Sequence, residues 1–328
     1  MTARHWPAVP APGVTMPDAN PADEGFQHLA FLYRSSQEYE ATLLPFIRGG
    51  LARSEPVFVA VPGPASEMLR DQLGQSSGQV VFGDMASMGL NPARIIPAVR
   101  AFVDEHPGRR VRYVGEPAWP ARSAEELRET ARHEALINRA FSGMAATILC
   151  PYDAAALSSS AVADARRTHP VLLRRGVRQA SREYRGPHGL PPGCDSPLSE
   201  PPSRAAKVRY ASNLRAIRDL VASHAVQAGL TAGRTADLVL AVGEIAANTL
   251  RHTRAGGTLY VWRTPDSLIC QIHDQGRITD PLAGRRRPAL DVLGGQGLWV
   301  VNQVCDLVEL RSGRAGTTVR LHMRLRQA

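Results

Sequence analysis

The sequence predicts two α/β domains that follow one another along the chain. In the first half, short β-rich runs alternate with helical stretches, a pattern typical of βαβ units on a mostly parallel sheet. In the second half the helices and strands are segregated, which favours an α/β sandwich whose helices cover one face of a mixed sheet. The chain has 328 residues, 44% of them hydrophobic, which is enough for a core in each domain.

Composition also suggests where the domains begin and end. Residues 1–25 are rich in Pro and Ala without a sustained period, so we expect a flexible tail there. Residues 186–206 are dense in Pro, Gly and Ser and lack apolar periodicity, which is typical of an interdomain linker. The first domain is therefore predicted at 26–180 and the second at 207–328.

The periodicity places the individual elements. In the first domain we expect strands at 28–33, 57–61, 79–84, 111–116 and 146–153, and helices at 38–51, 65–73, 91–105 and 124–141. In the second domain we expect helices at 212–228, 232–251 and 298–305, and strands at 258–263, 268–274, 308–311 and 317–325.

Targeting signals and cysteine spacing restrict the class of protein. No run of about 18 apolar residues occurs, and the first residues lack the apolar stretch of a secretion signal, so we expect a soluble, cytoplasmic chain with no membrane contact. The four cysteines lie far apart without a C-x-x-C spacing, which argues against both a disulfide framework and a structural zinc site. We expect reduced thiols.

The net charge of +9 invites a nucleic-acid hypothesis, which other features of the sequence disfavour. Nearly all of the positive charge is arginine, and Lys207 is the only lysine. No helix-turn-helix, zinc-finger or aromatic-plus-basic platform accompanies the arginines, so we expect no direct nucleic-acid binding. The lone lysine is not part of G-x-x-x-x-G-K-[ST], which excludes a P-loop.

A helical segment of the second domain displays polar side chains at four-residue spacing. Glu244 and Asn248 share one face of the helix, with His252 two turns along from Glu244. A carboxamide oxygen is a suitable ligand for Mg²⁺, and a neighbouring carboxylate can accept a proton from an attacking hydroxyl or water. Alone, this spacing is more typical of a solvated helix face.

Two further stretches have features of a nucleotide site. Asp274 ends a predicted strand and is followed by Gly276, in a position where a carboxylate can accept a hydrogen bond from the exocyclic amine of adenine. G-G-Q-G-L at 294–298 opens into an apolar helix, so backbone N–H groups at the helix start can bind phosphate oxygens. Each stretch alone is common in proteins that bind no nucleotide.

Together these stretches resemble the Bergerat ATP-binding fold of histidine kinases, gyrase-type ATPases and Hsp90-like chaperones, over about residues 207–326. The resemblance implies ATP and Mg²⁺ as cofactors, with Mg²⁺ bound by Asn248 and Glu244 as the base. It implies that Asp274 reads adenine and that Thr317, in a terminal G-T, supports the adenine end. The remaining nucleotide contacts are then His252, Gly276, Gly294, Gly295, Gly297 and Leu298.

The match has two departures from the family pattern. The family's D-x-G-x-G ends in Ile278, and the segment between the glycine boxes, which forms the ATP lid in the family, is short and basic at 284–287. These departures affect lid closure or nucleotide affinity but leave the adenine-reading carboxylate in place.

The subfamily is suggested by what surrounds the boxes. The sequence lacks the H-E-[LI]-R-x-P-L phosphoacceptor of a histidine kinase, and the short domain with G-G-Q-G-L-W-V-V looks most like the anti-sigma-factor serine kinases. That resemblance implies an anti-anti-sigma (STAS) protein as phosphoacceptor, a sigma factor as competing partner, and a homodimer. Two alternatives remain: an ATP-dependent module that sequesters a sigma factor without phosphotransfer, and an orphan histidine-kinase-like ATPase with a separate phosphoacceptor protein.

The first domain resembles MEDS sensory domains, which are similar in fold to KaiC and RecA but lack a working P-loop. The resemblance rests on H-L-A-F-L-Y from His28, on Gly115-Glu116 with Trp119, on H-E-A-L-I-N with Glu134 and Asn138, on C-P-Y-D from Cys150, and on His169-Pro170. It implies a regulatory role in which a small molecule or another signal is sensed.

The strand ends of this domain predict where a signal would bind. We expect a sensory pocket where His28, Glu116, Cys150, Tyr152 and Asp153 converge at one edge of the parallel sheet. Singly, His28 and Cys150 are more often structural residues, and a metal site formed by His and Cys has no support from their spacing.

Overall fold

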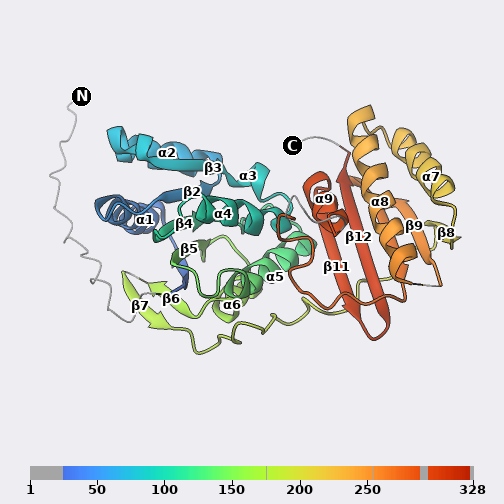
Figure 1. Ribbon diagram of the computed structural model, residues 1–328. Helices are drawn as coiled ribbons and strands as arrows, with labels where there is room; N and C mark the ends of the chain where they lie inside the picture. The colour runs from blue at the N-terminus through green and yellow to red at the C-terminus, as the bar shows by residue number, and fades with distance from the viewer. Residues whose placement is uncertain (1–24, 175, 254, 289–294, 326–328) are drawn as a thin grey trace, which may run out of the picture.

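The computed structural model describes residues 25–174, 176–253, 255–288 and 295–325. They form two sheets, one in each half of the chain, with helices packed against both (Figure 1). The expected fold class is confirmed: a mostly parallel α/β unit precedes an α/β sandwich. Among the described residues, no helix combines the length and apolar character needed to cross a membrane.

The N-terminal sheet has the order β3-β2-β4-β5-β1-β6-β7, and all its pairs are parallel except β6–β7. Its strands are β1 (Gln27–Tyr33), β2 (Val57–Val61), β3 (Val80–Asp84), β4 (Val111–Gly115), β5 (Ala146–Asp153), β6 (Val171–Arg174) and β7 (Val177–Ala180). Its helices are α1 (Ser36–Ala52), α2 (Gly63–Leu73), α3 (Met85–Met88), α4 (Ile95–Asp104), α5 (Ala124–Ala140) and α6 (Ser159–Thr168), with 3-10 turns η2 (Gly74–Gln79) and η3 (Pro92–Arg94).

The N-terminal sheet has an apolar core on each face, because its buried strands carry apolar side chains on both sides. One core joins the sheet to α1 and α2, and the other joins it to α4, α5 and α6. The sequence did not predict α6, β6 or β7. Of these, β7 is mostly exposed and completes the sheet as an antiparallel edge strand.

The C-terminal sheet has the order β11-β12-β10-β9-β8 and is antiparallel throughout the described strands. The expectation of a mixed sheet was wrong: β10 and β11 run in the same direction, but β12 lies between them, so no parallel pair forms. The elements are β8 (Ala206–Tyr210), α7 (Leu214–Gln227), α8 (Ala232–His252), β9 (Gly257–Arg263), β10 (Ser267–Asp274), α9 (Gly297–Val304), β11 (Leu307–Gly313) and β12 (Gly316–Arg324). The sequence did not predict the edge strand β8, in which only Tyr210 is buried.

Helices α7, α8 and α9 cover one face of this sheet and form its apolar core. The opposite face carries buried polar side chains, which include Gln271, Glu309, Arg311 and Arg320. Two of these side chains bond to the backbone of the 186–206 segment. Arg311 donates to the Ser196 carbonyl (3.2 Å), and Arg320 donates to the Ser199 carbonyl. The connection between the domains therefore covers part of this face.

Helix α5 lies between the two sheets (Figure 1). Ser123 caps it in a reciprocal capping box with Glu126, which fixes where the helix starts. Its sequence is polar, yet Glu126, Glu129 and Glu134 are all buried. Glu129 accepts a hydrogen bond from Arg311 (2.7 Å), and Glu126 one from Arg324, so the helix bonds directly to the C-terminal sheet.

Candidate functional site

Two of the predicted boxes meet where α8 passes the start of α9. A Cβ placed on Gly297, the first residue of α9, would lie 2.7 Å from Glu244 Oε2 and 3.1 Å from Asn248 Nδ2. Only a glycine fits this contact without displacing these side chains. The Asn248 Oδ1 atom accepts a hydrogen bond from Arg251 Nη1 (2.9 Å), which orients the amide.

The third box is organised around both carboxylate oxygens of Asp274, at the end of β10. Oδ2 accepts a hydrogen bond from the Thr249 hydroxyl (2.6 Å), and Oδ1 accepts one from the Gly276 backbone N–H (2.7 Å). Asp274 is paired in register with Thr317 on β12, and the Thr317 hydroxyl donates to the Gly276 carbonyl (2.8 Å). These bonds hold the strand end and the following turn in one arrangement.

Gly316 makes this pairing of strand ends possible. Its φ is +109°, and an added Cβ would lie 2.1 Å from the Asp274 carbonyl oxygen. Any side chain at this position would separate β12 from β10, which gives a structural reason for the G-T dipeptide.

A cavity of about 530 Å³ lies among these elements. It is lined by seven of the predicted nucleotide contacts: Asn248, His252, Asp274, Gly276, Gly295, Leu298 and Thr317. Glu244 and Asn248 both lie close to Gly297, but neither Glu244 nor Gly297 lines the cavity. Gly294 lies outside the described residues. The structure thus brings together three boxes that are separated in the sequence.

Several residues that line the cavity were not predicted. They include Thr249 and four arginines, Arg251, Arg277, Arg286 and Arg287. The basic character of 284–287 was visible in the sequence, but its position at the cavity was not. The four arginines outnumber the two aspartates of the lining, Asp274 and Asp280, a balance of charge that favours an anionic ligand.

The segment between β10 and α9 also contacts the N-terminal domain. Leu282 is 1% exposed and belongs to the same buried apolar cluster as Leu136 of α5. Arg285 donates to Glu129 Oε2 (3.3 Å), and Asn302 of α9 pairs with the Asn91 amide (3.2 Å). The part of the cavity wall that contains Leu282 therefore packs against the N-terminal domain.

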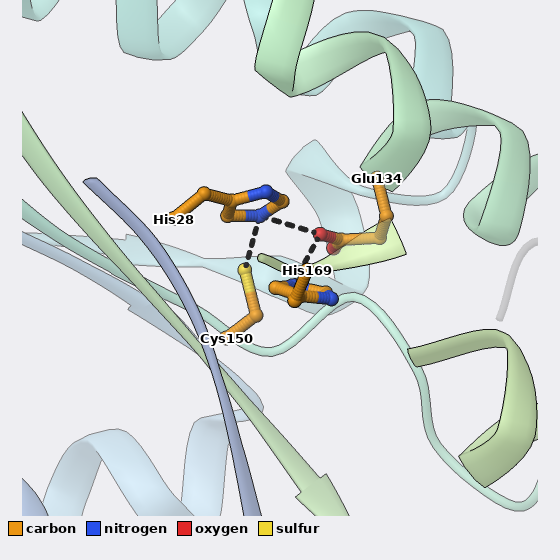
Figure 2. Close-up of side chains that lie close together, drawn as sticks. All are labelled: His28, Glu134, Cys150 and His169. Carbon is orange, nitrogen blue, oxygen red and sulfur yellow. Dashed lines mark hydrogen bonds and ion pairs between the residues drawn. The ribbon is translucent and has the colours of Figure 1, made fainter. Parts of the chain in front are cut away.

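The predicted sensory residues fall into two groups. His28 and Cys150 lie together on one face of the N-terminal sheet, with His28 Nε2 at 3.5 Å from Cys150 Sγ. Two residues outside the predicted pocket join them: Glu134 of α5 and His169, which ends α6 (Figure 2). Tyr152 packs edge-on against the His169 ring, at 5.6 Å between centroids.

The four clustered side chains are fully buried, and burial is the main cause of the shifted pKa values of two of them, His28 and Cys150. The pKa of His28 falls to about 4 because burial penalises the charged ring, with nearby His169 adding to the effect. Burial, with the Glu134 carboxylate nearby, raises the pKa of the Cys150 thiol well above its ordinary value. His28 is consequently neutral at physiological pH.

The second group lies at the carboxyl ends of the strands. Glu116 follows β4 and accepts hydrogen bonds from the Tyr33 hydroxyl (2.7 Å) and the Tyr39 hydroxyl (2.9 Å). Burial, and to a smaller degree the Asp153 carboxylate, raise the pKa of Glu116 to about 7 against the lowering effect of the two tyrosines. Asp153 Oδ1 accepts from the backbone N–H of Ala155 (2.8 Å). The five predicted pocket residues therefore do not converge at a single edge.

Family models match both halves of the chain. Residues 27–170 match the MEDS domain, described as the MEthanogen/methylotroph, DcmR Sensory domain, and residues 208–323 match the histidine kinase-like ATPase domain. The chain accordingly carries an N-terminal MEDS domain and a C-terminal histidine kinase-like ATPase domain, as its motifs predicted.

Similarity to individual proteins is more limited. The crystal structure of the RsbU and RsbW domains of Rv1364c from Mycobacterium tuberculosis matches with 19% identity and a TM-score of 0.29. The match covers 39% of this chain and 34% of that chain, so this chain spans about a third of the matched protein. No curated protein matches.

Proposed function

We propose that this protein is a signal-responsive regulator whose C-terminal domain binds ATP with Mg²⁺ in the 530 Å³ cavity. The observation that carries the proposal is the convergence of Asn248, Asp274 and Thr317 on one cavity, in a domain of histidine kinase-like ATPase type. The volume lies within the range of ligand pockets that bury most of a small ligand.

The residues present fit a nucleotide with its metal ion. Asn248 offers an amide oxygen of the kind Mg²⁺ prefers, beside the Glu244 carboxylate. The neighbouring start of α9 lacks a side-chain cap among the described residues, so its N–H groups can bind phosphate oxygens, aided by the cavity's arginines. Bound Mg²⁺ would neutralise charge on the phosphates.

The adenine end fits equally well. Asp274 is held by Thr249 and Gly276 with its carboxylate at the cavity, where it can accept a hydrogen bond from an exocyclic amine. Thr317 supports the turn on which Gly276 lies. In this arrangement Asp274 selects the base, and Glu244 accepts the proton of an attacking hydroxyl.

For the reaction, we propose transfer of phosphate to a serine or threonine of an anti-anti-sigma (STAS) partner, with a sigma factor as the competing partner and a homodimer as the assembly. The sequence supports this in two ways: it has no histidine-kinase phosphoacceptor string, and its glycine box resembles the anti-sigma-factor kinases. We therefore place the phosphoacceptor of the proposed reaction on a second protein.

Signal response is supported by the contacts between the domains. Leu282 and Arg285, which lie between the two glycine boxes, are buried against the MEDS domain. A change of the MEDS domain that moved α5 would displace the wall of the nucleotide cavity. Sensing and nucleotide binding thus share a structural element, as regulation requires.

One experiment distinguishes this proposal from its alternatives. The purified chain is mixed with labelled ATP, Mg²⁺ and candidate STAS proteins, and the product is analysed for its phosphate linkage. Acid-stable label on serine or threonine supports the proposal. Nucleotide-dependent sigma-factor binding without label supports sequestration instead, and acid-labile phosphate on a separate protein supports the histidine-kinase-like ATPase.

A further inference from the structure

We infer that His28, Glu134, Cys150 and His169 form a binding site for a divalent transition metal, and that zinc is the ion this donor set fits best. The inference goes beyond nucleotide binding and does not depend on it. It rests on the geometry of the four donor atoms, on their hydrogen-bond partners and on their combined charge.

The four donor atoms already have nearly the spacing of a coordination shell. They come from β1, α5, β5 and the end of α6, and all lie within 4.8 Å of one another (Figure 2). Glu134 Oε2 is 3.1 Å from both His28 Nε2 and His169 Nε2, and Cys150 Sγ is 3.5 Å from His28 Nε2. Zinc bonds to nitrogen, oxygen and sulfur in a tetrahedron separate the donors by about 3.3 to 3.7 Å.

Hydrogen bonds at the far side of each imidazole ring aim the other nitrogen at the cluster. His28 Nδ1 lies 3.1 Å from Asn138 Oδ1, and the Asn138 amide in turn donates to the Thr168 carbonyl (2.7 Å). This second bond fixes the amide so that its oxygen faces His28, which requires the proton on Nδ1. The lone pair of Nε2 then points into the cluster, as in metal-binding histidines.

His169 is oriented in the same way. Its Nδ1 donates to the Ala165 carbonyl at 2.8 Å, an arrangement that in the neutral ring places the lone pair on Nε2. Nε2 is buried without a hydrogen-bond partner among the described residues, although it lies 3.1 Å from Glu134 Oε2. A lone pair that faces a carboxylate oxygen is repulsive unless a proton or a cation lies between the two.

Glu134 shows the same need for a cation. Its Oε1 is buried and has no hydrogen-bond partner among the described residues, and the residue is 1% exposed. A buried carboxylate is costly unless it is hydrogen-bonded, paired with a charge or bound to a metal. One carboxylate and one thiolate would balance a 2+ ion, so the loaded site would carry no net charge.

The donor set also decides the class of ion. Two imidazoles and a thiolate disfavour Mg²⁺ and Ca²⁺, which take oxygen ligands, and favour zinc and similar transition metals. Four protein ligands from four separate elements make a closed site of the structural type. A metal bound there would join β1, β5 and the end of α6 to α5, the helix that bonds to the ATPase domain.

The test uses the full chain, expressed without an affinity tag that binds metal. Elemental analysis of protein purified without chelators should find zinc at about one per chain. Protein expressed in cobalt-supplemented medium should show thiolate-to-cobalt charge transfer and the intense visible bands of a tetrahedral site. These readouts are independent of ATP, so a failure of the proposed nucleotide site would not alter them.

Matched cysteine variants test whether Cys150 is the thiolate that gives the charge-transfer band. Cys150→Ser should abolish the charge-transfer band, whereas Cys194→Ser, at a buried cysteine whose thiol donates to the Arg128 carbonyl, should retain it. A variant in which Cys194, Cys270 and Cys305 are all serine leaves Cys150 as the only thiol and should retain the band, even if Cys150→Ser fails to fold. Negligible metal in the wild type with no cobalt spectrum, or loss of the band in the triple variant but not in Cys150→Ser, would overturn the inference.

Discussion

Glu129 is the residue whose replacement should most directly uncouple the two domains. It is 1% exposed on α5 and bonds to two arginines of the ATPase domain, Arg311 at 2.7 Å and Arg285 at 3.3 Å, which are themselves only 6% exposed. Each arginine also has a buried nitrogen with no hydrogen-bond partner among the described residues, Arg285 Nη1 and Arg311 Nη2. Glu129→Gln would remove the carboxylate that these two buried guanidinium groups share in the interface.

The size of the effect follows from the burial of all three groups. Removing one member of a buried ion pair usually destabilises a protein by about 3–5 kcal/mol. Glutamine keeps one acceptor oxygen, and Glu309 lies 4.0 Å from Arg311 as a second carboxylate, so the lower end of the range applies. We expect a loss of about 3 kcal/mol in the free energy of unfolding.

Urea unfolding of the full chain, followed by circular dichroism, measures this loss, which should appear in the transition that separates the domains. Glu67→Gln on α2 is the matched control, because that carboxylate is exposed and its change should stay within about 0.5 kcal/mol. If Glu129→Gln unfolds at the same urea concentration as Glu67→Gln, the buried ion pairs do not hold the domains together, and the argument for coupling through α5 fails.

Three further predictions concern individual residues. Gly297→Ala should displace the Glu244 carboxylate and lower the rate of phosphotransfer about tenfold or more. The control Gly233→Ala, at a glycine with open space around it, should leave the rate unchanged. Equal rates for the two variants in a kinase assay would contradict the contact between Gly297 and Glu244. Glu244→Gln should lower phosphotransfer by about 10²-fold or more yet leave ATP affinity unchanged, and an equal loss of both, by calorimetry and kinase assay, would exclude its role as the base. The pKa of Glu116 rises from 4.5 to about 7 on folding, so the folded protein binds more protons between these values, and stability should fall as the pH rises through this window. In urea unfolding, Glu116→Gln should flatten that dependence, and an unchanged slope would show that another group causes it.

The nucleotide boxes could be predicted because each is a local pattern. The four-residue spacing of Glu244 and Asn248 needs only a helix, and Asp274 needs only a strand that ends in a glycine turn. Their order along the chain then identified the domain type, which the family match confirms. The register that pairs Asp274 with Thr317 is a property of the whole sheet, and the sequence indicated it only through the family resemblance.

Helix α5 shows what the sequence could not give. Its polar composition is typical of a solvated surface helix, yet it is buried because it lies between two domains. The partners of Glu129 are 156 and 182 residues away along the chain, too far for any periodicity to reveal. The burial of Leu282 could not be predicted either, because the segment that carries it packs against the other domain.

The histidine and cysteine cluster could be predicted only in part: its residues, but not their meeting. His28, Glu134, Cys150 and His169 were each visible in the sequence, but His28 is 106 residues from Glu134 and 122 from Cys150. Their meeting depends on the parallel pairing of β1 with β5 and on the packing of α5 over both. Spacing rules for metal sites detect ligands that share a turn or a helix, so a site assembled from four elements escapes them.

The central claim is that three separated stretches form one cavity for ATP with Mg²⁺. Isothermal titration calorimetry of the full chain with ATP and Mg²⁺ tests it most directly, with Asp274→Asn as the comparison. The account predicts saturable binding of one nucleotide per chain by the wild type, and affinity lowered at least about tenfold in the variant, because the amide no longer offers a charged acceptor to adenine. No heat with the wild type, or equal affinity in both proteins, would contradict it.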